Sequence, residues 1–148
     1  MDDFRYLEGS LSCEGVSMRD IAKSVGTPCY VYSSETFRQH FTRLRDAFAP
    51  INPLICFSVK CCSNLAILRL LTELGAGMDV VSGGELFRAM KAGGDPKNFV
   101  YAGVGKSDAE IRFALEQRIG LFNVESEMEF ENLARIARET GIQTGAAL

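Results

Sequence analysis

The sequence has few of the residues that build metal sites and disulfide frameworks. It contains one histidine, His40, and five cysteines, none of which form a C-x-x-C pair. An odd number of cysteines without that spacing provides neither a disulfide framework nor a set of zinc ligands. We therefore expect no metal site, and we expect reduced thiols, as in a cytosolic protein.

The sequence also lacks long apolar runs and any excess of positive charge. No apolar stretch approaches the length of about 20 residues that a membrane-spanning helix needs. The first residues, Met1-Asp2-Asp3, do not begin a signal peptide. A formal net charge of −3 argues against a nucleic-acid or anionic-membrane surface. We expect a cytoplasmic, globular protein that binds neither nucleic acid nor membrane.

What the sequence does contain is a repeated pattern of strand and helix. Apolar, β-rich runs occur at residues 54–60, 78–82, 99–103, 121–125 and 145–148. Segments with the apolar spacing of helices separate these runs. Three of the segments begin with Ser-x-x-Glu, the form of a capping box, at Ser82, Ser107 and Ser126. This repeat predicts an α/β fold with a parallel sheet and helices outside it. Such a sheet is either open and doubly wound or closed into a barrel, and the repeat alone does not choose between them.

The first third of the chain has a less regular pattern. Residues 29–32 (CYVY) predict one more strand, and a helix is expected from about residue 34 to residue 48. The segment 49–53, with two prolines, ends that helix. Residues 1–26 are interpreted as a lead-in, with a helical pattern over 17–25.

Lys60 ends the apolar run 54–60 and is the first candidate for chemistry. A lysine amine becomes a nucleophile when burial at the end of a strand removes its proton. A neutral lysine is the usual partner of a carbonyl group, including the aldehyde of pyridoxal phosphate. On this run alone, a lysine that meets solvent where a strand stops is the commoner explanation.

Alternation along a strand places Cys56, Ser58 and Lys60 on one face. Asp79 interrupts an apolar run on the next strand, and a buried carboxylate needs a partner, for which Lys60 is the obvious candidate. The alternative is an acid at a strand edge that reaches water. Glu85 is explained by its position as the capping partner of a serine.

Four blocks in order and spacing closely resemble the N-terminal part of the fold-type III pyridoxal-phosphate decarboxylases. They are residues 63–68 (SNLAIL), 75–86 (GAGMDVVSGGEL), 103–108 (GVGKSD) and 122–127 (FNVESE). Within that group, the chain looks most like the bacterial diaminopimelate decarboxylases from about residue 27 onward. One departure is Cys61-Cys62, where many members have Ala-Asn.

The resemblance implies an alanine-racemase-like (β/α)8 TIM barrel, of which this chain holds about five βα-type strands. It also implies that Lys60 forms the Schiff base with pyridoxal 5'-phosphate, and that Asp79 lies beside it. On the inward face, Ser58 would contribute to cofactor binding. Glu85 would add a supporting role to its cap, whereas Glu110 and Glu129 are interpreted as caps only.

The implied organisation is a lead-in at residues 1–26, followed at 27–148 by a truncated N-terminal part of the barrel without the β-rich C-terminal domain. The implied function of the intact enzyme, a homodimer acting on a small amino acid, is decarboxylation of meso-2,6-diaminopimelate to L-lysine. This chain alone is expected to be inactive. The alternatives are a decarboxylase of ornithine, arginine or carboxynorspermidine, a non-catalytic barrel that binds the cofactor, and a truncated product without activity.

Overall fold

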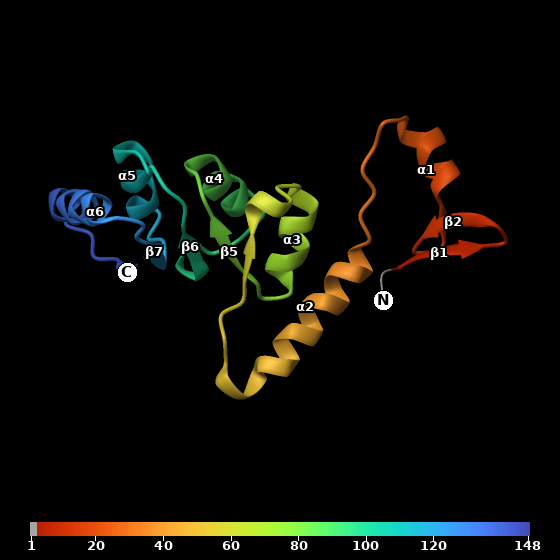
Figure 1. Ribbon diagram of the computed structural model, residues 1–148, viewed down its shortest axis with the longest axis horizontal. Helices are drawn as coiled ribbons and strands as arrows, with labels where there is room; N and C mark the ends of the chain where they lie inside the picture. The colour runs from red at the N-terminus through yellow and green to blue at the C-terminus, as the bar shows by residue number, and fades with distance from the viewer. Residues whose placement is uncertain (1–2) are drawn as a thin grey trace. The chain divides into compact units, whose positions relative to one another are not determined.

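The computed structural model describes residues 3–148 and is shown in Figure 1. The chain divides into two compact units, Met1–Ala49 and Pro50–Leu148. Each unit has a sheet of its own, antiparallel in the first and parallel in the second. None of the helices between residues 3 and 148 is long and apolar enough to cross a membrane.

The first unit begins with a three-stranded antiparallel sheet, which the sequence pattern did not predict. Its strands are β1 (Phe4–Leu7), β2 (Ser10–Cys13) and β3 (Val16–Ser17), in the order β1-β2-β3. Glu-Gly pairs with positive φ at both residues form the two turns. Such turns match the twist of paired strands and therefore favour tight hairpins. The strands are too short to show a clear alternation in the sequence, which is why the pattern of residues 1–26 did not predict them.

Two helices complete this unit. Helix α1 spans Met18–Val25 and α2 spans Ser34–Phe48, as the sequence predicted for both. The strand expected at residues 29–32 is wrong, because this segment forms no strand in the structure. A β-rich composition describes side chains that suit a pleated sheet, and by itself it does not decide that the segment joins one.

The second unit alternates strands and helices. Its elements are β4 (Cys56–Ser58), α3 (Leu65–Glu73), β5 (Gly77–Val80), α4 (Gly83–Lys91), β6 (Phe99–Tyr101), α5 (Asp108–Glu116), β7 (Leu121–Asn123), α6 (Glu127–Thr140) and β8 (Gly145–Ala147), with short 3-10 turns at Ala49–Ile51, Val59–Cys61 and Pro96–Asn98. All five strands are parallel and lie in the order β4-β5-β6-β7-β8. Consecutive helices α3 to α6 also contact one another in sequence order. The sheet therefore winds in one direction, as in a barrel, without the reversal of strand order that a doubly wound sheet has.

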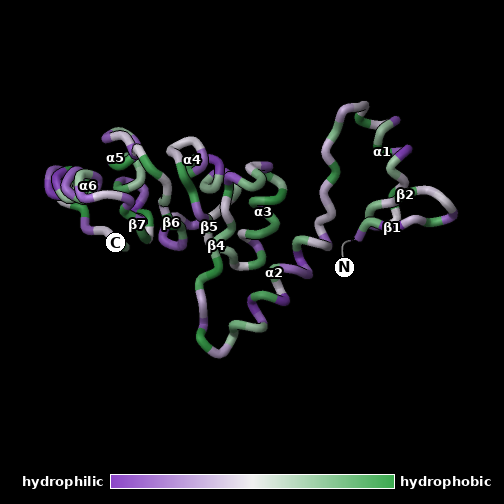
Figure 2. Tube along the Cα trace, viewed as in Figure 1, coloured by the Kyte–Doolittle hydropathy of each residue, from purple (hydrophilic) through white to green (hydrophobic). Residues whose placement is uncertain are grey.

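The two faces of the parallel sheet differ in burial. Met78, Val80, Tyr101 and Phe122 have no exposed surface, and Phe99 is 1% exposed. The alternate residues Ser58, Asp79, Val100 and Leu121 lie on the opposite face and are only partly buried. The helices thus pack on the first face, and Figure 2 shows hydrophobic residues concentrated in α3 and a mostly hydrophilic α6.

The predicted caps are present, with one full capping box. Ser82, Ser107 and Ser126 accept hydrogen bonds from the backbone N–H three residues on. At Ser107 the reciprocal bond from Glu110 is also made. The carboxylates of the other two helix starts bind elsewhere, so the caps locate the helices correctly but do not describe all that their glutamates do.

Candidate functional site

The carboxyl ends of β4 and β5 bring two polar side chains together. Ser58 is paired in register with Asp79, which in turn is paired with Val100 on β6. All three lie on the face of the sheet that the helices leave open. Because the strands are parallel, their carboxyl ends meet at one edge, where enzymes of this architecture place their chemistry.

Lys60 follows this strand by two residues and lies in a turn rather than in the strand. The 3-10 segment Val59–Cys61 begins directly after β4, and Cys62 N–H closes it by donating to Val59 O over 3.1 Å. Val59 is fully buried, whereas Lys60 is exposed. The expectation that Lys60 is buried at the end of a strand is therefore wrong. Alternation stops at Ser58, since the chain bends out of the sheet after that residue.

Ser58 and Asp79 both have polar atoms without protein partners. The hydroxyl oxygen of Ser58 is buried and makes no hydrogen bond within the described part of the chain. Neither the Asp79 nor the Lys60 side chain forms a hydrogen bond or an ion pair with residues 3–148, so the expected Lys60–Asp79 pair is not formed. Burial, and to a smaller degree the charge of Asp79, raise the pKa of the nearby Cys56 thiol.

Glu85 holds the start of α4 in place. Its backbone N–H donates to Ser82 Oγ (3.2 Å), and its carboxylate accepts from Val81 N–H (2.8 Å). The capping interpretation is thus confirmed, with Val81 rather than Ser82 as the backbone donor. Its additional supporting role near Lys60 stays a prediction.

The chain matches the pyridoxal-binding domain of pyridoxal-dependent decarboxylases over residues 34–145. This match covers more than half of the chain and includes every residue of the candidate site.

The chain belongs to the pyridoxal-dependent decarboxylase family.

Named relatives align with most or all of the chain. Diaminopimelate decarboxylase of Pseudomonas aeruginosa is 46% identical over 148 residues, which are 100% of this chain and 36% of that protein. The crystal structure of diaminopimelate decarboxylase from M. jannaschii with L-lysine has a TM-score of 0.92 at 33% identity, covering 98% of this chain and 35% of the other. The enzyme from Helicobacter pylori, also solved with L-lysine, has a TM-score of 0.81 at 40% identity, over 86% and 33%. The chain thus spans about a third of the length of these relatives, and its α/β fold is that of an incomplete barrel, as predicted.

The groups present fit the pyridoxal cofactor of this decarboxylase family. An aldehyde needs an accessible amine, which Lys60 offers at the open edge of the sheet. The Ser58 hydroxyl, which is buried and has no hydrogen-bond partner in the described part of the chain, lies at the same strand end. Buried polar groups without a partner are rare in proteins, and a missing ligand is one explanation for such a group. The in-register carboxylate of Asp79 adds negative charge on the same face.

The other lysine at this edge of the decarboxylase domain, Lys106, has no free hydrogen-bond donor. Lys106 Nζ donates to Gly103 O (2.8 Å), Asn123 O (2.8 Å) and Glu129 Oε1 (2.5 Å), and 2% of its side chain is exposed. An ammonium group has three donors, so all of them are used. The interpretation of Glu129 as a cap only is therefore wrong, because its carboxylate pairs with a lysine that is 23 residues away in the sequence.

Glu110 is a second acid for which the interpretation as a cap only is incomplete. Its Oε1 accepts from Gly83 N–H of the preceding helix over 2.9 Å, in addition to its bonds with Ser107. These donors lower the pKa of Glu110 to about 2, with Gly83 as the largest cause. Burial, followed by the charge of Glu110, raises the pKa of Tyr101. The Ser-x-x-Glu signal located Glu110 and Glu129, but it holds no information on partners from other βα units.

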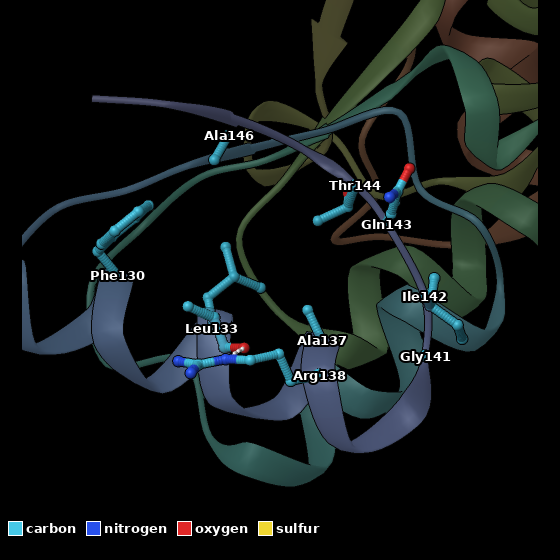
Figure 3. Close-up of a pocket in the computed structure, with 10 residues that line it drawn as sticks. Phe130, Leu133, Ala137, Arg138, Gly141, Ile142, Gln143, Thr144 and Ala146 are labelled. Carbon is cyan, nitrogen blue, oxygen red and sulfur yellow. Dashed lines mark hydrogen bonds between the residues drawn. The ribbon is translucent and has the colours of Figure 1, made fainter.

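A pocket of about 520 Å³ lies beside β8, the edge strand farthest from β4, between α6 and the segment leading into β8. Figure 3 shows its mainly apolar lining, with Leu133, Ala137 and Ile142 from the two walls. Its one ionic group, Arg138, donates to Ala134 O of its own helix. The pocket therefore offers no group for the chemistry of a pyridoxal enzyme.

Proposed function

We propose that the protein carrying this chain decarboxylates meso-2,6-diaminopimelate to L-lysine, and that Lys60 holds pyridoxal 5'-phosphate in it. The observation that supports this role most directly is the contrast between the two lysines at the carboxyl edge. Lys60 is exposed and makes no ion pair with residues 3–148, while every donor of Lys106 is occupied. Similarity to diaminopimelate decarboxylases over 86–100% of the chain, two of them solved with L-lysine, supports the substrate.

The proposed residues divide the work by position. Lys60 holds the cofactor through its aldehyde carbon, and Ser58 offers a hydroxyl at the inner face of the strand end. The carboxylate of Asp79 favours positive charge on a nitrogen close to it. When bound, the cofactor ring accepts the electron pair that carbon dioxide leaves behind.

The proposal extends to parts of the protein outside this chain. Residues 27–148 would be the N-terminal part of the barrel and residues 1–26 a lead-in. The remaining strands, a phosphate-binding loop and a β-rich domain would lie in the rest of a longer, homodimeric enzyme. The sheet described here has open edges at β4 and β8. A barrel has no such edges, so the 148 residues alone should release negligible carbon dioxide.

Chemical labelling tests the role of Lys60. The full-length gene product is loaded with pyridoxal phosphate, reduced with borohydride and digested, and the modified peptide is identified by mass spectrometry. We expect the label on Lys60, and a label on Lys91 or Lys106 instead would overturn the assignment.

Substrate assays test the reaction. Carbon dioxide release is measured with diaminopimelate, lysine, ornithine and arginine in turn, using the full-length protein and the 148-residue chain. Turnover of diaminopimelate by the full-length protein alone is expected. Preference for ornithine or arginine would change the substrate, and cofactor binding without any turnover would indicate a non-catalytic barrel.

A further inference from the structure

Arg88 connects the helix that follows β5 to the loop that carries Lys60. Its Nε donates to the backbone oxygen of Ser63 over 3.1 Å. Ser63 lies between the 3-10 segment Val59–Cys61, called the Lys60 turn below, and the start of α3. Arg88 lies in the last turn of α4. The bond therefore joins two consecutive βα units at the candidate site, between residues 25 positions apart.

The Lys60 turn depends on few anchors. On one side, the buried Val59 fixes the turn to the core, and Cys62 N–H closes it on Val59 O. On the other side, Asn64 caps α3 by accepting from Ala66 N–H over 2.9 Å. Ser63 lies between these anchors, and Arg88 is the side chain that reaches it from another element.

The exposed amine of Lys60 has no partner of its own within residues 3–148 to direct it. A lysine side chain extends from its backbone through four rotatable bonds. A change in the orientation of that backbone therefore moves the whole region that the amine can reach. A hydrogen bond from a charged donor to a loop carbonyl restricts that backbone. Arg88 forms no ion pair in the described structure, so the Ser63 carbonyl is the acceptor that its guanidinium has there.

We propose that Arg88 is a positioning residue, which holds the Lys60 turn so that the lysine amine faces the cofactor site. This role rests on the proposed function of Lys60. It requires no contact between Arg88 and the cofactor, because the arginine acts through the backbone at Ser63.

The test compares Arg88→Met with Arg88→Lys in the full-length protein. Methionine keeps much of the apolar stem and loses the donor, whereas lysine keeps a charged donor of similar reach. We expect Arg88→Met to weaken pyridoxal phosphate binding about three- to tenfold, the loss typical of one hydrogen bond. Amide exchange of a peptide covering residues 61–66 should accelerate by a similar factor, and Arg88→Lys should recover part of both effects.

Arg138→Met provides a matched control. Arg138 also donates from Nε to a backbone oxygen, over 3.0 Å, but this oxygen belongs to Ala134 in its own helix. This variant should leave cofactor binding and the exchange of residues 61–66 unchanged.

The outcomes separate the two proposals. Borohydride labelling of the unmodified protein at a lysine other than Lys60 would overturn the proposed function and the positioning role with it. A label on Lys60, together with unchanged cofactor affinity in Arg88→Met, would overturn the positioning role alone. Equal losses in Arg88→Met and Arg138→Met would also contradict it, because they would reflect a general loss of surface charge.

Discussion

Two lysines follow strands of the same sheet and have opposite environments. Lys106, after β6, is buried and joins three segments through Gly103, Asn123 and Glu129. Lys60, after β4, is exposed on a short turn and makes no bond of its own in the described structure. A lysine in the first environment stabilises a fold, and one in the second is available to a ligand. Lys60 and Lys106 share their residue type and a position after a strand of the sheet, so the difference between their environments comes from packing.

The largest effect, a loss of unfolding free energy, should come from removing the buried ammonium group of Lys106. Lys106→Met removes one member of a buried ion pair and leaves Glu129 and two backbone carbonyls without their donor. Such a change costs about 3–5 kcal/mol of unfolding free energy. Urea denaturation of the full-length protein measures this loss. The double variant Lys106→Met, Glu129→Leu should lose less than the sum of the two single changes, and strict additivity would show that the two side chains do not interact.

Glu110→Gln should have an intermediate effect that depends on pH. The pKa of Glu110 is lowered to about 2 in the folded chain from the ordinary glutamate value of 4.5. The ionised form therefore stabilises the fold above pH 4.5, and this contribution is lost as the pH falls towards 2. With allowance for solvent screening, we expect a loss of about 1–2 kcal/mol at pH 7.

Urea denaturation of both proteins at pH 7, 5, 4 and 3 measures that dependence. The difference in unfolding free energy between wild type and Glu110→Gln should shrink at the two lower values. A difference that stays constant would contradict the stabilising role of the charge.

Lys60→Ala should separate function from stability. An exposed side chain without partners contributes little to the fold, so the unfolding free energy should change by less than about 0.5 kcal/mol. The absorbance of covalently held cofactor should nevertheless disappear in the full-length protein. Retention of that absorbance, or a loss of stability as large as that of Lys106→Met, would remove the distinction between the two lysines.

The smallest effect is expected from Asp79→Asn, which changes a charge and keeps the shape. The Asp79 side chain has no hydrogen bond or ion pair to lose in the described structure. Without its negative charge, a protonated nitrogen nearby is less favoured, so the absorbance change of the bound cofactor should move to lower pH. Spectrophotometric titration of the full-length protein measures this shift. An identical titration with normal turnover would show that Asp79 has no electrostatic role in the site.

Local signals in the sequence were sufficient for much of the fold. The helix at Ser34–Phe48, the serine caps at Ser82, Ser107 and Ser126, and the five parallel strands followed from patterns within about ten residues. Lys60, Ser58 and Asp79 could be named because strand ends are visible in the same patterns, and the family resemblance selected among them.

What the sequence by itself determined was the repeat of βα units and the identity of the candidate side chains, because both depend on neighbours along the chain. Tertiary structure decided that Lys60 is exposed beyond its strand and that residues 29–32 form no strand. It also decided the partners of Glu110, Glu129 and Arg88, which lie 23 to 27 positions away. Burial and pairing of this kind depend on how consecutive βα units pack, and no periodicity within one unit contains that information.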